Sequence, residues 1–223
     1  MENICLFGDS LARGVILDSK RMRYGISQCC FAGLLEESCD VKIENYAKFG
    51  CTIEKGFDII EKHSKNIEKC DLVMLEFGGN DCDYEWEEVS KNPLGNFCAK
   101  TEINRFREIY EKIVGKLISM GKDVVMLSLP PIDSERYFSW ISRNKNAENI
   151  KKWLGSISYI YRWHEMYSNA VCSIARKMKV GLIDLRSAFL EKRNIGDYIC
   201  LDGIHPNENG QRLMCREIIK YGI

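Results

Sequence analysis

Residues 71–77 read Asp-Leu-Val-Met-Leu-Glu-Phe, a short apolar run without the polar–apolar alternation of a strand that has one face in water. A run of this kind is typical of a parallel strand whose two faces are both covered by helices. Four further segments have the same character, namely residues 3–8, 41–47, 123–129 and 180–185. We expect these segments to form one buried parallel sheet.

Segments with helical spacing separate the predicted strands. Residues 52–69 and 102–120 each place apolar side chains three and four positions apart, on one face of a helix. Thr52 is expected to cap the first helix, and Gly121 to end the second. This alternation predicts a three-layer α/β/α sandwich with a flavodoxin-like order 2-1-3-4-5 of five strands. We expect one domain over residues 1–223.

One segment departs from this compact pattern. Residues 130–155 begin with Pro-Pro-Ile-Asp-Ser and are rich in aromatic side chains, including Tyr137 and Trp140. The segment leaves the carboxyl-terminal edge of the predicted sheet, where ligands of such folds bind. Tyr137 and Trp140, together with Trp86, are therefore candidates to line a substrate pocket, and core packing is the competing interpretation. We expect an aromatic-rich insertion near the active site.

Composition excludes several classes of partner. The chain has 223 residues, and 32 Lys and Arg balance 32 Asp and Glu. A net charge of zero argues against a nucleic-acid partner and against attraction to anionic membranes. The chain starts without a signal-peptide pattern, and no apolar run approaches the ~18 residues of a membrane span. We therefore expect a cytoplasmic protein without stable membrane insertion, whose oligomeric state the sequence leaves open.

The cysteines are interpreted as packing residues. There are eleven of them, with no CxxC pair and no recurring Cys/His spacing. Neither a disulfide framework nor a zinc site is supported by such a pattern. Cys51 and Cys82 flank motifs discussed below, and we favour packing over chemistry for both.

A serine, a histidine and an aspartate stand at expected strand or loop ends. Ser10 closes the first strand, where it is expected to project from a strand-to-helix turn. His205 follows Asp202 by three residues, just before a helical run that opens at about Asn207. A neutral imidazole can take the proton of an unactivated hydroxyl, and a nearby carboxylate can hold its tautomer. The spacing predicts that Asp202 and His205 lie on one turn.

Acyl transfer also needs hydrogen-bond donors for a developing oxyanion. Asn80 ends the third predicted strand with a side-chain amide that can donate. Gly50 follows the second strand, and its backbone N–H is sterically open to a ligand. With the N–H of Ser10, the sequence offers three candidate donors at one edge of the sheet.

Four short motifs occur in order along the chain. They are Gly8-Asp9-Ser10, Gly50, Gly78-Gly79-Asn80-Asp81 and Asp202-Gly203-Ile204-His205. Together they resemble the SGNH (GDSL) hydrolases over almost the whole chain. The resemblance implies the three-layer fold, Ser10 as nucleophile, His205 as base and Asp202 as its orienting partner. It further implies an oxyanion hole of Ser10, Gly50 and Asn80, with no metal and no organic cofactor.

The chain departs from many of these relatives after the nucleophile. Residues 11–14 read Leu-Ala-Arg-Gly, where many relatives have a Thr and a Gly. The Gly-x-Ser-x-Gly elbow of ordinary α/β-hydrolases is also missing.

The expected activity is hydrolysis of a small-molecule carboxylic ester through an acyl-enzyme. A short acyl or acetyl group on a small alcohol or carbohydrate is the first candidate. A lysophospholipase or an acyl thioesterase would use the same groups. A catalytically silent α/β binding module is the alternative from another class, and a flavin-binding protein ranks last because no phosphate loop follows the first strand.

Other polar residues near the motifs have structural interpretations. Asp9 and Asp81 are expected to hold their loops through hydrogen bonds to backbone N–H groups. Glu76 is interpreted as a rim or hydrogen-bonded structural carboxylate. His63 is expected to be solvated on its helix, and His164 to be packed rather than to act as a second base.

Overall fold

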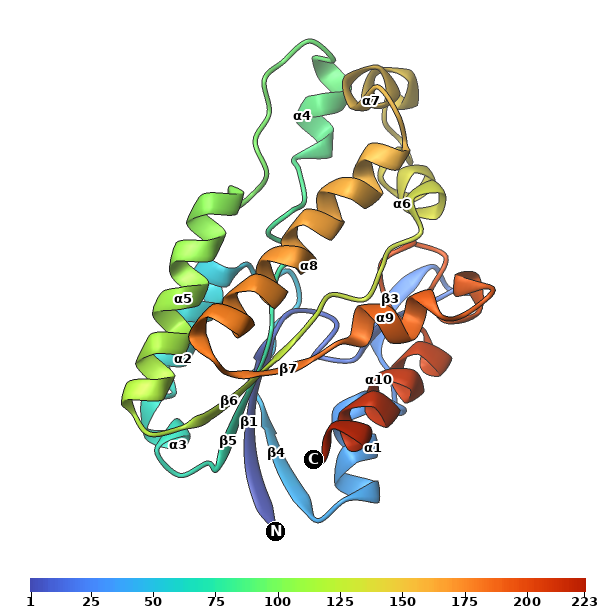
Figure 1. Ribbon diagram of the computed structural model, residues 1–223. Helices are drawn as coiled ribbons and strands as arrows, with labels where there is room; N and C mark the ends of the chain where they lie inside the picture. Colours follow the sequence, from blue (N-terminus) through green and yellow to red (C-terminus); the bar gives the residue numbers. More distant parts are fainter.

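The computed structural model describes residues 1–223 and has a five-stranded parallel sheet at its centre (Figure 1). Its strands are β1 (Glu2–Gly8), β4 (Val41–Asn45), β5 (Leu72–Glu76), β6 (Asp123–Leu127) and β7 (Gly181–Ile183). Their order across the sheet is β4-β1-β5-β6-β7. The order 2-1-3-4-5 predicted from the sequence is therefore confirmed.

Helices cover both faces of this sheet. One face carries α2 (Ile53–Lys62), α5 (Ile103–Ser119) and α8 (Ser158–Met178), and the other carries α1 (Phe31–Ser38), α9 (Leu185–Leu190) and α10 (Glu208–Tyr221). Alternate residues of β1 point to opposite faces, so that Phe7 enters the first core and Leu6 the second. The three-layer architecture is confirmed, and it explains why the strands are apolar on both sides.

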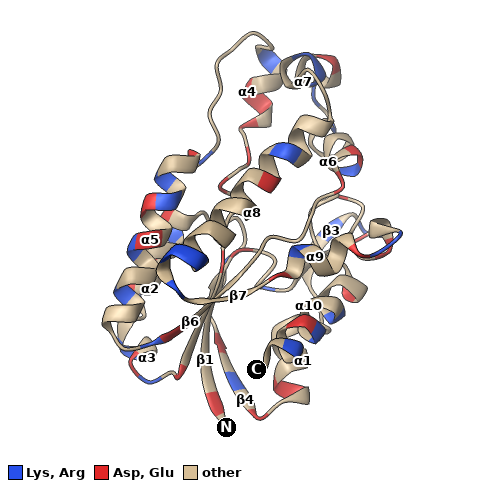
Figure 2. Ribbon diagram, in the orientation of Figure 1, with Lys and Arg blue, Asp and Glu red and all other residues tan.

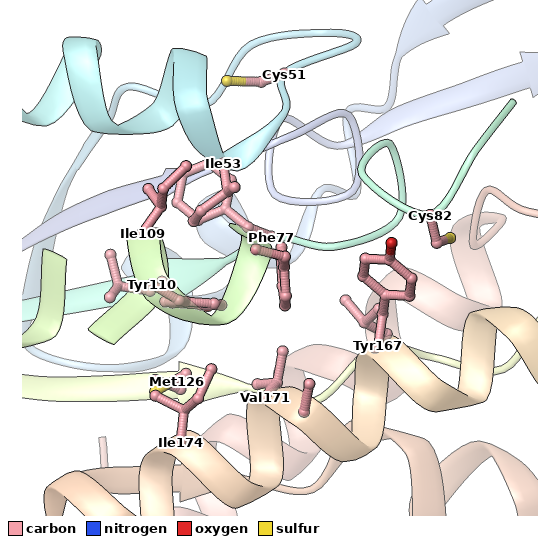
Figure 3. Close-up of a cluster of buried hydrophobic side chains, with 14 of the residues drawn as sticks. Cys51, Ile53, Phe77, Cys82, Ile109, Tyr110, Met126, Tyr167, Val171 and Ile174 are labelled. Carbon is pink, nitrogen blue, oxygen red and sulfur yellow. The ribbon is translucent and has the colours of Figure 1, made fainter. Parts of the chain in front are cut away.

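The first of these cores is rich in large side chains. Figure 3 shows Ile53 of α2, Tyr110 of α5 and Ile174 of α8 converging on the sheet side of their helices. Phe77, directly after β5, lies among them and is 1% exposed. Its ring stands edge-on to Tyr110, with the ring centroids 6.1 Å apart. Packing of this kind anchors the end of β5, and with it the loop that follows.

Lys and Arg are interspersed with Asp and Glu along the helices, as the blue and red segments of the ribbon show (Figure 2). This distribution agrees with the zero net charge of the chain. No helix combines the length and the apolar composition that would be needed to cross a membrane.

The helix predicted over residues 52–69 is two helices. The first, α2, ends at Lys62, and α3 follows as Ser64–Ile67. The break falls at His63, whose backbone leaves the helical range (φ −102°, ψ 18°). Its ring packs on Tyr46, with the centroids 4.1 Å apart, so His63 is not simply solvated. The prediction of one continuous helix was wrong. The apolar spacing runs on from α2 to Ile67 and hides the break, which depends on the contact of His63 with Tyr46.

Strands β6 and β7 both end earlier than predicted, at Leu127 and Ile183. Directly after them, Ser128 Oγ donates to Asp184 Oδ1 at 3.0 Å. The Asp184 carboxylate also accepts the N–H of Ser187 at 3.1 Å and so caps α9. The two chain segments are thus held together by side chains where the backbone ladder stops.

A small hairpin, β2 (Val15–Asp18) and β3 (Arg23–Ile26), was not predicted. Its two strands pair only with each other, in antiparallel register. The turn is closed by Asp18, whose Oδ1 accepts the N–H groups of Lys20 at 2.9 Å and Arg21 at 3.1 Å. All of β3 is exposed, so it has no apolar pattern that could have marked it in the sequence.

The remaining helices are α4 (Trp86–Lys91), α6 (Ser134–Ile141), α7 (Ala147–Leu154) and a 3₁₀ turn, η1 (Ile195–Asp197). Figure 1 shows α4, α6 and α7 beyond the carboxyl-terminal edge of the sheet, beside the first turns of α8. Residues 130–155 therefore contribute two of the three helices that stand above this edge.

Asp81 joins the loop after β5 to the start of α2. Its side chain is fully buried, and Oδ1 accepts the N–H of Ile53 at 2.9 Å. Thr52 occupies the cap position of α2, but its side chain makes no capping hydrogen bond. The prediction of a Thr52 side-chain cap was wrong, and Asp81 instead accepts the first backbone N–H of the helix. The predicted loop-holding role of Asp81 agrees with this contact, and burial raises the pKa of Asp81 to about 7.

The raised pKa of Asp81 makes stability depend on pH in a defined direction. Between about pH 4 and pH 7 the folded protein keeps a proton on Asp81 that the unfolded chain has lost, so the free energy of unfolding falls as pH rises. The change is up to about 1.4 kcal/mol per pH unit. Asp81→Asn keeps the acceptor for Ile53 and carries no charge. We expect a flatter pH profile for Asp81→Asn than for the wild type.

Urea unfolding at several pH values across this window measures the difference. Asp58→Asn, at an exposed position of α2, is the matched control and should follow the wild-type profile. Equal slopes in the wild type and in Asp81→Asn would contradict the assignment.

Candidate active site

Three loops meet side by side at the carboxyl-terminal edge of the sheet. Gly50 follows β4, Ser10 follows β1 and Asn80 follows β5. Because β1 lies between β4 and β5, Ser10 stands between the other two residues. Parallel strands end at the same edge, which is why residues so far apart in the sequence meet here.

Ser10, His205 and Asp202 form one hydrogen-bonded chain. Ser10 Oγ lies 2.8 Å from His205 Nε2, and His205 Nδ1 lies 2.7 Å from Asp202 Oδ2. The other carboxylate oxygen, Oδ1, accepts the backbone N–H groups of Ile204 and His205, both at 3.1 Å. Ser10 and His205 are 5% and 2% exposed, and Asp202 is completely buried. With a proton on Nδ1, the Nε2 atom can accept the hydroxyl proton of Ser10.

The carboxylate of Asp202 is held in its charged form. Burial alone would raise its pKa, but the hydrogen bonds from the His205 side chain and from the two backbone N–H groups outweigh burial and lower it. A charged Asp202 can stabilise a positive charge that develops on the imidazole.

The loop between Asp202 and His205 is fixed by a glycine. Gly203 has φ +80°, and a Cβ there would lie 2.4 Å from the backbone nitrogen of Tyr137. Its carbonyl accepts the N–H of Asp133 at 2.8 Å. Only glycine fits this conformation and this approach. The start of α6 and the loop that carries His205 are therefore packed backbone to backbone.

The chain after Ser10 forms a tight turn that leads into β2, so the expected strand-to-helix turn is wrong. Asp9 organises this turn, since its Oδ1 accepts the N–H of Leu11 at 2.9 Å and its carbonyl accepts the N–H of Arg13 at 3.0 Å. No helix begins until Phe31, so Ser10 does not lead directly into a helix. The loop-holding interpretation of Asp9 agrees with these contacts.

Two backbone donors and one side-chain donor converge beside Ser10. The N–H groups of Ser10 and Gly50 make no hydrogen bond within the protein. Gly50 has φ +67°, and the space where its Cβ would stand is open. Asn80 Nδ2 donates to Asp9 Oδ2 at 2.9 Å, which fixes the plane of the amide and leaves its second N–H available.

Behind Asp9 lies a second buried carboxyl group, that of Glu76. Both side chains are completely buried, and Glu76 Oε2 accepts the N–H of Asp9 at 3.4 Å. Burial, and next the negative charge of Asp9, raise the pKa of Glu76 well above its usual range. Glu76 is thus a hydrogen-bonded structural group, as one of its two interpretations held, and it does not lie at a rim. Burial raises the pKa of Asp9 as well.

A cavity of about 340 Å³ opens beside Ser10 and His205. Its walls are mainly apolar, with many aromatic rings from the hairpin, α4, α6 and α8. The three sequence candidates Trp86, Tyr137 and Trp140 all line it. Trp86 Nε1 donates to Asp83 Oδ1 at 2.7 Å, and the Tyr137 hydroxyl donates to the same oxygen at 2.5 Å. The polar atoms of Trp86 and Tyr137 are thus hydrogen-bonded within the protein, and their apolar rings form part of the cavity wall.

Two aromatic residues at the mouth of the cavity were missed in the sequence. Tyr24 of β3 and Phe49 lie against the imidazole of His205, with ring centroids 5.1 Å and 6.1 Å away. Tyr24 is 38% exposed and Phe49 59% exposed. Tyr24 sits in the unpredicted hairpin, but Phe49 precedes Gly50 directly, and its place beside that motif could have identified it.

Comparisons with known proteins show the family to which the chain belongs. Residues 6–213 match the GDSL-like lipase/acylhydrolase family. A rice protein (Oryza sativa subsp. japonica), the GDSL esterase/lipase WDL1, is 26% identical over 197 residues, which cover 85% of this chain and 67% of the rice protein.

Solved structures share the fold at low sequence identity. A lipase/acylhydrolase from Enterococcus faecalis superposes with a TM-score of 0.68 at 22% identity, covering 99% of this chain and 94% of that one. Axe2, an acetylxylan esterase from Geobacillus stearothermophilus, gives a TM-score of 0.67 at 14% identity, covering 100% of this chain and 94% of that one. On the family match over nearly its whole length, the chain belongs to the GDSL-like lipase/acylhydrolase family of serine ester hydrolases.

Proposed function

We propose that Ser10 is the nucleophile of a carboxylic ester hydrolase, with His205 as general base and Asp202 as its orienting partner. The observation that carries the proposal is the alignment of Ser10 Oγ, His205 and Asp202 at 2.8 Å and 2.7 Å, beside two unpartnered backbone N–H groups. A silent binding module would have no use for a base, a carboxylate and free donors in one place.

The reaction follows from these contacts. Ser10 Oγ attacks the ester carbonyl while its proton passes to His205 Nε2, and Asp202 stabilises the imidazolium. The carbonyl oxygen becomes an oxyanion within reach of the N–H groups of Ser10 and Gly50 and of the Asn80 amide. The C–O bond to the alcohol then breaks, and His205 gives its proton to the leaving oxygen. Water repeats the sequence on the acyl-enzyme and releases the acid.

The position of the two substrate parts is inferred from His205. Because His205 protonates the leaving alcohol, the alcohol lies on its side of the carbonyl, beside the exposed rings of Tyr24 and Phe49. The acyl group then extends the other way, into the enclosed part of the cavity. We propose that residues 1–223 act as one domain whose 130–155 segment supplies walls of that cavity.

The size of the cavity bears on acyl length. At about 340 Å³ it falls among pockets that hold small organic ligands, and it is far larger than an acetyl group. We therefore extend the first candidate, a short acyl or acetyl ester of a small alcohol or carbohydrate, to acyl chains of medium length. The apolar walls also support the second candidate, a lysophospholipase or acyl thioesterase. For that activity the cavity would have to accept a long acyl chain.

Ser10→Ala tests the nucleophile. We expect kcat for p-nitrophenyl acetate to fall by about a thousandfold or more, since the residues of such a triad act as a unit. A fluorophosphonate probe should label the wild type and not the variant. Ser19→Ala, at an exposed position of the hairpin turn, is the matched control. Full activity in Ser10→Ala would rule out this nucleophile.

Asn80→Ala tests the oxyanion donor. Loss of one such donor is expected to lower kcat by about 10²–10³-fold with little change in KM, because the contact forms mainly in the transition state. Steady-state kinetics measures this split, with Asn169→Ala on the exposed side of α8 as control. An unchanged kcat would contradict the role.

A series of p-nitrophenyl esters from acetyl to palmitoyl tests acyl length. The cavity is lined both by Ser10, after β1, and by Leu129, after β6. Two strand spacings of ~4.8 Å separate these strand ends, a distance that an extended acyl chain of about eight carbons would span. We therefore expect kcat/KM to rise towards about eight carbons. It should then fall for palmitoyl. A maximum at acetyl would favour the short-chain candidate, and a rise up to palmitoyl would favour the lysophospholipase or thioesterase.

A further inference from the structure

His164 is one of the few polar side chains, with Asp83 and Lys100, that line the mainly apolar cavity away from the triad. The residue lies on α8, is 6% exposed and lines the cavity. Its Nδ1 lies 3.4 Å from Nη1 of Arg186. Its Nε2 makes no hydrogen bond within the protein and is not among the fully enclosed polar atoms, so it faces the cavity.

The contact with Arg186 fixes the tautomer of His164. A guanidinium has only donors, so Nδ1 of His164 must act as the acceptor, and the ring proton must sit on Nε2. Burial, and next the positive charge of Arg186, lower the pKa of His164 to about 3, so the ring stays neutral. His164 therefore presents a neutral N–H donor to the cavity.

Arg186 is a buried cation that forms no salt bridge. It is 7% exposed, and the charge of Asp184, two residues before it, acts on it from a longer distance. Its Nη1 donates to the carbonyl of Leu129 at 3.3 Å, while Nε and Nη2 have no partner. The guanidinium lies over the ring of Tyr161 at 5.1 Å. A buried guanidinium with two unpartnered nitrogen atoms favours a strong hydrogen-bond acceptor nearby.

The location of this pair relative to Ser10 follows from the sheet. Leu129, which Arg186 contacts, emerges from β6, and β6 is separated from β1 by β5 alone. At ~4.8 Å per strand spacing, the strand ends that lead to Leu129 and to Ser10 are on the order of 10 Å apart. A saturated chain advances roughly 1.25 Å per bond, given its bond lengths and angles, so about eight atoms span the distance.

We propose that His164, backed by Arg186, is a specificity-determining donor for an acyl chain that carries an oxygen acceptor, best a carboxylate, about eight atoms from the ester carbonyl. The inference rests on the proposed function, in that the acyl group occupies the cavity. The preferred substrates are then half-esters of medium-chain dicarboxylic acids. A purely apolar cavity would reject such a group, because nothing would replace its lost hydration.

A pair of substrates that differ only at the far end of the chain provides the test. They are the p-nitrophenyl ester of octanoic acid and the mono-p-nitrophenyl ester of octanedioic acid. For the wild type we expect kcat/KM to favour the dicarboxylic half-ester by about tenfold, the usual size of a hydrogen bond to a charged group. A preference of the wild type for octanoate would overturn the proposal.

Variants separate recognition from packing. His164→Phe keeps a ring and removes the donor, so the tenfold ratio should be lost. His164→Gln keeps both an acceptor for Arg186 and a donor towards the cavity, and should retain most of the ratio. His63→Phe, far from the cavity wall, is the matched control. If His164→Phe does not fold, as judged by thermal unfolding, the ratio in His164→Gln and in Arg186→Met decides. An unchanged ratio in Arg186→Met would contradict the role of the buried cation.

Binding distinguishes failure of this inference from failure of the proposed function. Calorimetry on Ser10→Ala compares methyl octanoate with monomethyl octanedioate, without any turnover. Tighter binding of the half-ester supports the donor at His164 even if the wild type hydrolysed neither p-nitrophenyl ester. Equal or weaker binding of the half-ester would overturn the inference while leaving the esterase assignment untouched.

Discussion

The pairing of β1 with β4 on one side and β5 on the other is the constraint on which the site depends. It is a backbone ladder, with Leu6 beside Asn45 and beside Met74 in register. The register brings three strand ends to one edge, so that Ser10 lies between Gly50 and Asn80. The apolar strands, packed on both faces, hold this register firmly, because a slip would misplace every buried side chain.

Buried carboxyl groups refine what the sheet provides. Asp9 fixes the Asn80 amide, Asp81 holds the start of α2, and Glu76 lies behind Asp9 in the interior. Burying so many acids costs stability, and the raised pKa values of Glu76 and Asp81 express that cost. The protein tolerates it where the acids hold the loops of the site, as is common for functional regions of folds.

The sequence predicted the sheet and its order well, because each buried strand is a compact apolar run that needs no knowledge of its neighbours. It also placed the motifs at one edge, since parallel strands share an edge. It could not predict what depends on contacts between distant segments. The break at His63 depends on Tyr46, and the cap of α2 comes from Asp81 rather than Thr52. The partnership of His164 with Arg186 joins residues on α8 and α9 that no local pattern connects.

The hairpin of β2 and β3 forms a sheet of its own, separate from the central one. Its strands pair only with each other, but β2 is tied to the rest of the protein. Val15 and Leu17 are buried, and the N–H of Val15 donates to the carbonyl of Ser10 at 2.9 Å. The other strand brings Tyr24 to within 5.1 Å of the His205 ring, measured between centroids. The hairpin is thus anchored through β2, while the exposed strand β3 stands at the entrance of the site. Exchange of the side chains of β3, or a longer turn between the two strands, would change which alcohols are accepted and leave the buried contacts of β2 in place.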